Sequence, residues 1–229
     1  MKRQISIENT DIYYDLILKN KKNISIKINS NGHLIIYAPI GISLAYIEKL
    51  LIRKKKWIIK NLNIVNNNPY NLKNSIIFLG NKYDIKLEIT QKESICLDSE
   101  FIYIKSKSID YKYIQNLLGS WYKEQAEKIL FDRVNILSNY CRLYPSNIII
   151  KDQKTRWGSC SSKKEIRLNW RLILMPNSII DYIIIHELCH LKIMNHSSDF
   201  WELVKIYVPN YREYKKWLNE NGSLIMSVK

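Results

Sequence analysis

Residues 183–196 read IIIHELCHLKIMNH, and this segment decides both the fold and the chemistry that we expect. An apolar run leads into His-Glu-x-x-His, and a third histidine, His196, follows six positions after the second. The chain has four histidines, and three of them fall here. Residues four apart on a helix share one face, with Cβ atoms about 5–6 Å apart. His186 and His190 can therefore reach one metal ion.

A carboxylate stands next to the first of these histidines, at Glu187. Two imidazoles beside a carboxylate base are typical of zinc hydrolases. Zinc held by three neutral imidazoles keeps a fourth position for water and lowers the pKa of that water to about 7. Glu187 would take the water's proton and pass it to the leaving group. Iron, manganese or nickel could also bind three histidines, although Zn2+ is the expected ion. The alternative interpretation is a buried helix with incidental histidines.

The third ligand is expected to be His196, because imidazole suits zinc. The metzincin pattern has the same separation but places a glycine midway, where this chain has Ile193. The chain would then have to leave the helix later, at Asn195, which tolerates a left-handed backbone. If His196 only capped the helix, Glu202 or Glu213 would supply the ligand.

Composition sets broad bounds on the protein. The 229 residues suit one large domain or two small ones, and the 46% hydrophobic fraction is enough for a sizeable core. We expect no transmembrane helix and no signal peptide, so a cytoplasmic location is predicted. The four cysteines are widely spaced, which argues against a disulfide framework and a zinc ribbon. Cys189 should be a small core residue.

The net charge of +15 favours a partner that is a nucleic acid, an anionic substrate or an anionic surface. The best local candidate for a phosphate contact is the basic block 53–56. The alternative is a compositional bias, because the chain is rich in Lys, Ile and Asn, as an AT-rich genome would produce.

The periodicity of the apolar residues predicts an α+β protein. A β-rich N-terminal domain, residues 1–110, contains one helix, near 44–61, and an Asn-rich linker, 61–74. The second domain, residues 111–229, opens with a long helix that ends near residue 141. Further elements are expected at 148–151 (strand), 165–172 (strand), 179–194 (central buried helix), from residue 198 (helix) and at 210–219 (helix, ending near Gly222). No internal repeat is evident.

The loop 155–162 reads TRWGSCSS and carries a second set of candidate residues. Gly158 allows close backbone approach, and Arg156 could bind an anion or the oxyanion of a transition state. The alternative is that Trp157 fills the core and Arg156 forms a structural salt bridge.

Taken together, the loop TRWGSCSS, the segment RLNWRL at 167–172, HELCH and the motif NHSSDFW at 195–201 resemble the YgjP-like metallopeptidase family. That family belongs with the zincin-type proteases and is similar to SprT-like domains. The resemblance implies a zincin-like catalytic half built on the HExxH helix, with metal ligands at His186, His190 and His196. It also implies a catalytic glutamate at Glu187.

The strand 165–172 resembles the edge strand that zincins offer to an extended peptide, which makes Arg167 and Asn169 candidate substrate-binding residues. Its alternative is a covered, purely structural strand.

Three functions are consistent with the sequence. The first is a zinc metallopeptidase that acts on peptides or proteins. The second is a zinc-dependent nucleotide pyrophosphohydrolase, because hydrolysis of phosphoanhydrides has also been attached to the family name. The third is a DNA-associated protease module whose basic block 53–56 contacts nucleic acid. The sequence does not determine the oligomeric state.

Overall fold

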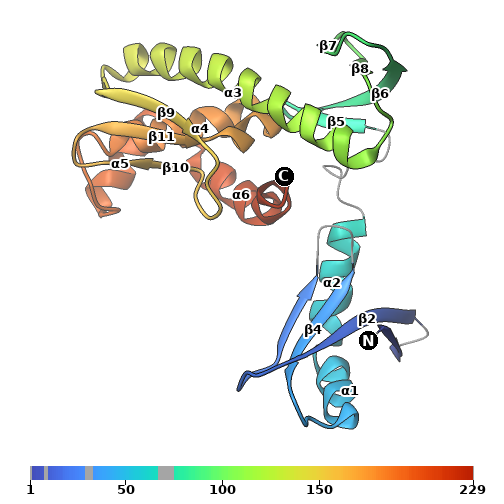
Figure 1. Ribbon diagram of the computed structural model, residues 1–229. Coiled ribbons are helices and arrows are strands. Elements are labelled where there is room, and N and C mark those ends of the chain that lie inside the picture. The colour runs from blue at the N-terminus through green and yellow to red at the C-terminus, as the bar shows by residue number, and fades with distance from the viewer. Residues whose placement is uncertain (1, 8–9, 29–32, 67–74, 229) are drawn as a thin grey trace. The chain divides into compact units, whose positions relative to one another are not determined.

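A computed structural model describes residues 2–7, 10–28, 33–66 and 75–228 (Figure 1). Over these residues the chain is a mixed α+β protein with three sheets and six α-helices. The predicted α+β class is confirmed at this level. None of the described helices is long and apolar enough to cross a membrane.

The chain forms two compact units, Met1–Asn71 and Leu72–Lys229. This division precedes the predicted boundary at residue 110 by one four-stranded sheet. The reason is packing: the Tyr122 hydroxyl donates a hydrogen bond to the Ile77 carbonyl at 2.8 Å. The Leu79 amide donates to the carbonyl of Ile173. Of the predicted linker 61–74, residues 67–74 lie outside the described ranges.

The first unit is a four-stranded sheet covered by two helices. Its strand order is β1-β2-β4-β3, and its core is mostly aliphatic, with Leu34, Ile36 and Leu51 fully buried beside Tyr14. The single helix predicted at 44–61 is two helices, broken at Lys54, whose amide bonds to the carbonyls of both Leu50 and Leu51. The elements are β1 (Lys2–Ile7), β2 (Thr10–Lys19), β3 (Ser25–Ile28), β4 (Leu34–Pro39), α1 (Leu44–Arg53) and α2 (Lys55–Asn66).

The second unit opens with a sheet of the same topology. Its order is β5-β6-β8-β7, and in both sheets the two inner strands pair in parallel while each outer strand pairs antiparallel. The elements are β5 (Ser75–Phe78), β6 (Asn81–Ile89), β7 (Ser94–Leu97), β8 (Phe101–Ser106) and α3 (Tyr111–Cys141).

Each of these two sheets is followed by a helix whose N-terminal cap residue accepts a hydrogen bond from the amide three residues later. Ser43 accepts a hydrogen bond from the Tyr46 amide, and Asp110 accepts one from the Tyr113 amide. The chain thus contains a repeated supersecondary unit, although no repeat was predicted from the sequence. The two copies share strand topology and the position of the helix cap more than residue identities.

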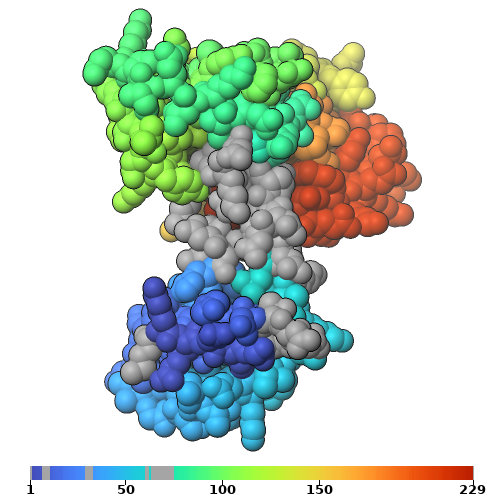
Figure 2. Space-filling model, turned by 90° about the vertical axis from the view of Figure 1, so that its right-hand side faces the viewer, coloured from blue at the N-terminus to red at the C-terminus, as the bar shows by residue number. Residues whose placement is uncertain are grey.

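The remaining elements form the third sheet and the C-terminal helices. They are β9 (Asn147–Lys151), β10 (Gly158–Cys160), β11 (Glu165–Asn169), the 3₁₀ helix η1 (Trp170–Leu174), α4 (Asn177–Cys189), α5 (Ser198–Tyr207) and α6 (Tyr211–Met226). The helix α4 packs on the sheet, and the helices α5 and α6 pack against α4. The helix α3 runs along this part of the unit and also reaches β5 (Figure 1). In the space-filling view the green surface of β5–β8 adjoins the orange and red C-terminal segments (Figure 2).

Three predicted boundaries in this region are wrong. The strand 165–172 ends at Asn169, because the Asn169 side chain accepts a hydrogen bond from the Arg171 amide and caps η1. The central helix ends at Cys189 rather than at residue 194. The last helix continues past Gly222 to Met226. The glycine is explained by packing instead, because a Cβ atom there would lie only 3.3 Å from Cζ2 of Trp157. Gly222 therefore provides contact space for the indole inside a helix.

Candidate metal centre

The helix α4 positions the first two histidines. It is apolar on nearly every side, and Ile180, Ile184 and Leu188 are almost completely buried between α3, the third sheet and the following helices. Such a helix is held rigidly by its packing. His186 lies in its last turn, and His190 is its C-terminal cap residue.

Three imidazoles converge at the end of α4. The ligand atoms of His186, His190 and His196 all lie within 4.8 Å of one another. The Nε2 atoms of His186 and His196 are 3.0 Å apart. Two nitrogens bound to a tetrahedral zinc at about 2.05 Å would be about 3.4 Å apart. Among the His, Cys, Asp and Glu residues that the structure describes, these three histidines form the cluster that could hold a metal ion. Neither Glu202 nor Glu213 belongs to it.

The chain leaves the helix earlier than predicted, directly after His190. The amides of Leu191 and Lys192 bond to carbonyls three residues back, which tightens the last turn. The His190 Nδ1 atom lies 2.9 Å from the Ile193 carbonyl oxygen. A proton on Nδ1 would donate to that carbonyl and leave Nε2 free for a metal. The predicted left-handed Asn195 is wrong, because the described non-glycine residues with positive φ are Leu79, Arg142 and Lys164.

Burial favours the neutral form of His186 and of His190. It lowers the pKa of His186 to about 3, and the charges of His190, His196 and Lys215 act in the same direction. Burial also lowers the pKa of His190, against the effect of its hydrogen bond to Ile193. Metals bind the neutral imidazole, so both side chains are prepared as ligands. The Nδ1 atom of His186 is buried and has no hydrogen-bond partner among the described residues.

Glu187 is buried beside the imidazoles, with only 6% of its surface exposed. Burial raises its pKa to about 8, and the charge of Arg156 opposes this shift. The carboxyl group lies against the backbone of β10: a Cβ atom at Gly158 would be 2.7 Å from Cγ and from Oε1 of Glu187. The close approach expected at Gly158 is therefore an approach to this glutamate.

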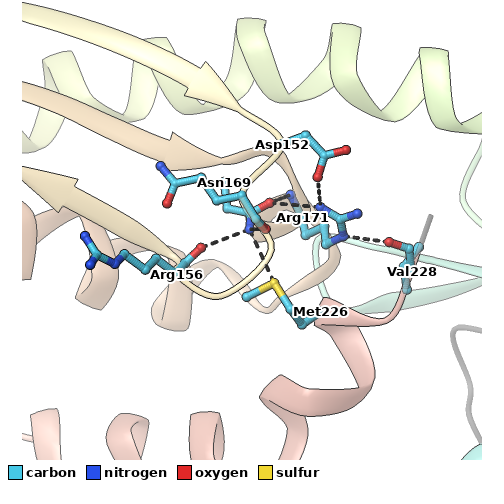
Figure 3. Close-up of polar contacts among 7 residues, drawn as sticks. Asp152, Arg156, Asn169, Arg171, Met226 and Val228 are labelled. Carbon is cyan, nitrogen blue, oxygen red and sulfur yellow. Dashed lines mark hydrogen bonds and ion pairs between the residues drawn. The ribbon is translucent and has the colours of Figure 1, made fainter. Parts of the chain in front are cut away.

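The Arg156 loop is fixed by a polar network (Figure 3). Asn169, which is fully buried, donates hydrogen bonds from Nδ2 to the carbonyls of Gln153, at 2.8 Å, and Arg156, at 3.0 Å. Arg171 is also buried, and it donates to Asp152 and to the carbonyl of Val228, both at 2.6 Å. The guanidinium of Arg156 points away from Asn169 (Figure 3) and is exposed.

The prediction that the strand 165–172 lies at a sheet edge is wrong. The strand β11 is central, paired in parallel with β9 and antiparallel with β10. An extended peptide cannot pair with a strand whose two sides are occupied. The edge strand that packs on α4 is β10. In β11, Arg167 donates a hydrogen bond to Glu165 at 2.9 Å, and Asn169 is inaccessible to solvent.

Two aromatic residues also contact the imidazoles, and neither was predicted to belong to the site. The ring of Phe200 is fully buried, and its centroid lies 4.4–4.9 Å from those of all three histidines. The Trp201 ring lies 5.7 Å from those of His186 and His196. Their position at the start of α5, four and five residues after His196, is the sequence feature from which this contact could have been predicted.

A family model described as YgjP-like, metallopeptidase domain, matches residues 22–221. The match covers most of both units. The chain belongs to the YgjP-like metallopeptidase family. It is accordingly a metal-dependent hydrolase of the peptidase class, and peptides or proteins are the substrates that such a class implies. The three histidines that could bind a metal ion lie within the matched region.

The chain is also similar to the solved structures of two metallopeptidase zymogens. One is the metallopeptidase zymogen jannalysin of Methanocaldococcus jannaschii, with 30% identity and a TM-score of 0.37, covering 40% of this chain and 95% of that one. The other is the metallopeptidase zymogen abylysin of Pyrococcus abyssi, with 23% identity and a TM-score of 0.36, covering 40% and 93%. No protein with a curated description matches the chain.

The basic block 53–56 lies in the first unit, where α1 meets α2. Arg53, Lys54 and Lys56 are exposed there.

Proposed function

We propose that this YgjP-like protein is a zinc-dependent peptidase with a zincin-like site, in which His186, His190 and His196 hold the metal and Glu187 acts as general base. One observation carries the proposal: three imidazoles whose ligand atoms lie within 4.8 Å of one another meet at the end of the buried helix α4, which also carries a buried carboxyl group. Peptidase activity itself follows from the family.

The donor set fits zinc. Three imidazoles are a ligand set that catalytic zinc uses, and carboxylates or carbonyls, which harder ions prefer, are absent from the trio. Burial lowers the pKa values of His186 and His190, which reduces the competition between protons and metal. When bound, zinc supplies a Lewis acid that polarises a carbonyl group and acidifies water.

Glu187 moves the proton. Burial raises the pKa of its carboxyl group to about 8 in the metal-free protein. A zinc ion held by the neighbouring imidazoles would lower this pKa toward neutral pH, where a general base and acid is most effective. In the proposed role, the Glu187 carboxylate accepts a proton from the water that attacks the scissile carbonyl carbon. It then returns this proton to the nitrogen of the leaving amine. Because Gly158 has no side chain, the Glu187 carboxyl group fits against β10.

Arg156 is proposed to stabilise the oxyanion that forms on the scissile carbonyl. Its positive charge lowers the pKa of Glu187, so the guanidinium acts on the same site. Asn169 and Arg171 hold the loop on which it stands. A fixed donor is worth more than a mobile one, because it needs no reorganisation as charge develops.

The substrate backbone is proposed to pair with β10 rather than with β11. The strand β10 is at the edge of its sheet, and it contains Gly158, the residue against Glu187. Addition of an extended peptide to such an edge would place its carbonyl groups beside the general base.

The test compares zinc-loaded wild type with Glu187→Gln on a peptide library and on a panel of nucleoside triphosphates. We expect wild type to cleave peptides, and Glu187→Gln to lose at least about 100-fold in rate while it binds zinc equally. Equal metal content, measured by elemental analysis, is the control. Full activity in the variant would refute the role of Glu187. Hydrolysis of nucleotides without peptide cleavage would replace the peptidase by the pyrophosphohydrolase.

A further inference from the structure

A shallow pocket lies beside the candidate metal centre. Its volume is about 330 Å³, and residues of α5 and α6 form its walls. Its aromatic part contains Trp201 and Tyr211, and its polar part contains Arg212, Lys215, Lys216 and Asn219. The lining thus includes three cationic side chains and no carboxylate.

The aromatic part of the pocket connects it to the imidazoles. The rings of Trp201 and Tyr211 stack at 5.2 Å with an angle of 18°. The Trp201 ring also stacks on the ring of His196, at 5.7 Å and 29°. One indole is therefore shared between the pocket and the metal site, so a single ring separates the pocket from His196.

The polar part of the pocket is a stripe on one face of α6. Positions 212, 215, 216 and 219 follow the spacing i, i+3, i+4 and i+7, which places them on the same side of a helix. The Lys215 Nζ atom lies 4.7 Å from the centroid of the Trp201 ring. This contact orients the ammonium group over the indole.

The two lysines of this stripe, Lys215 and Lys216, have no ion-pair partner in the part of the chain that the structure describes. Glu202 acts on Arg212 and lies 3.9 Å from Lys205. Glu213 and Glu220 of α6 are three and four positions from Lys216, and neither forms an ion pair with it among the described residues. Like charges on one helix face repel each other, so a bound anion would stabilise the arrangement.

We propose that this pocket binds an acidic side chain of the peptide substrate, with Lys215 and Lys216 contacting the carboxylate and Trp201 contacting its methylene groups. The inference rests on the proposed peptidase function. Lys215 is at most about 10 Å from the His196 ring by way of Trp201. An extended chain advances about 3.3 Å per residue, so the acidic residue stands within about three positions of the bond that is cut.

The test uses the zinc-loaded full chain and pairs of peptides that are identical except for Glu or Gln at one position near the cleaved bond. The measured quantity is the ratio of kcat/KM for the two members of each pair. Wild type should prefer the Glu peptide by about tenfold at low salt, and the preference should decline as salt screens the charges. The double variant Lys215→Gln/Lys216→Gln should bring the ratio close to one.

The charge-reversed variant Lys215→Glu/Lys216→Glu should invert the preference toward peptides with Lys at that position. The matched control, Lys112→Gln/Lys123→Gln, removes two exposed lysines from α3 and should keep the wild-type ratio. Peptide cleavage with a ratio near one at every position in wild type would overturn the acidic subsite and leave the peptidase function intact. Absence of peptide cleavage would count against the proposed function, and nucleotide hydrolysis sensitive to the two lysines would assign the pocket to phosphate instead.

Discussion

Gly158 on β10 and Glu187 on α4 lie so close together that no side chain fits between them. A Cβ atom at Gly158 would lie 2.7 Å from Cγ and Oε1 of Glu187 and 2.9 Å from Cδ. Such distances are shorter than van der Waals contact. The glycine is therefore explained by this close approach, and the position of the carboxyl group depends on the strand beside it.

Gly158→Ala should displace the carboxyl group of Glu187. The helix α4 is buried on nearly every side, so its backbone cannot shift easily. The glutamate side chain would instead have to rotate away from the added methyl group. A displacement of about 1 Å can cost about 100-fold in rate, so we expect kcat to fall by about 10- to 100-fold. The zinc content should be unchanged. The control is Ser159→Ala on the same strand, and equal kcat in both variants would contradict the contact.

Glu187 should also determine how the stability of the metal-free protein depends on pH. Burial raises the pKa of this carboxyl group from 4.5 to about 8. Between these values the native state keeps a proton that the unfolded chain has released. The free energy of unfolding should therefore fall as the pH rises from about 4.5 to about 8, by an amount on the order of a few kcal/mol.

Glu187→Gln removes this titration. Denaturation in the presence of a chelator should show the variant more stable than wild type at pH 8, with the two converging near pH 4.5. The control is Glu127→Gln, which changes an exposed carboxylate on α3 and should follow the wild-type curve. A stability difference that does not vary with pH would contradict the buried, protonated carboxyl group.

Zinc should stabilise the protein through the three histidines. A ligand that binds only the native state at 100 times its Kd adds about 2.7 kcal/mol, so the Tm of wild type should rise with zinc. His190→Ala should abolish most of this rise, because the imidazole whose Nδ1 atom is held by the Ile193 carbonyl is lost. His33→Ala, which removes a histidine of the first unit paired with Asp15, should retain it. An unchanged zinc response in His190→Ala would exclude it as a ligand.

Periodicity and motif spacing were enough to predict the class of the fold. They also predicted that the three histidines lie close together. Alternating Ile residues predicted the strands, and the apolar run before His186 predicted the buried helix. These signals are local, because each depends on residues a few positions apart. The same spacing predicted that His186 and His190 face one side, and the structure places their ring centroids 4.9 Å apart.

The features that were mispredicted depend on contacts between distant residues. The end of β11 depends on the Asn169 side chain, which caps η1 and also binds the loop before β10. Gly222 looked like a helix end, but it is a contact site for Trp157. The edge position of β10 follows from strand order, which no local pattern encodes. The contact of Phe200 with all three imidazoles was not predicted either, because it depends on how α5 packs against the end of α4.

Asn169 was expected from the sequence to bind substrate, and its surroundings support a positioning role instead. Asn169→Ala should remove the two hydrogen bonds to the carbonyls of Gln153 and Arg156. Loss of partners for buried groups costs about 1–3 kcal/mol, which should appear as a lower Tm. Because the Arg156 loop would be less fixed, we expect kcat to fall by about tenfold, with a smaller change in KM.

Asn169→Asp sharpens this test, because the carboxylate can still accept a hydrogen bond from the Arg171 amide but cannot donate to the two loop carbonyls. It should lower both Tm and kcat, as Asn169→Ala does. The control Asn147→Ala changes an exposed asparagine on β9 and should affect neither quantity. An increased KM with unchanged Tm and kcat would favour direct substrate binding by Asn169, since a residue that only contacts substrate does not stabilise the free protein.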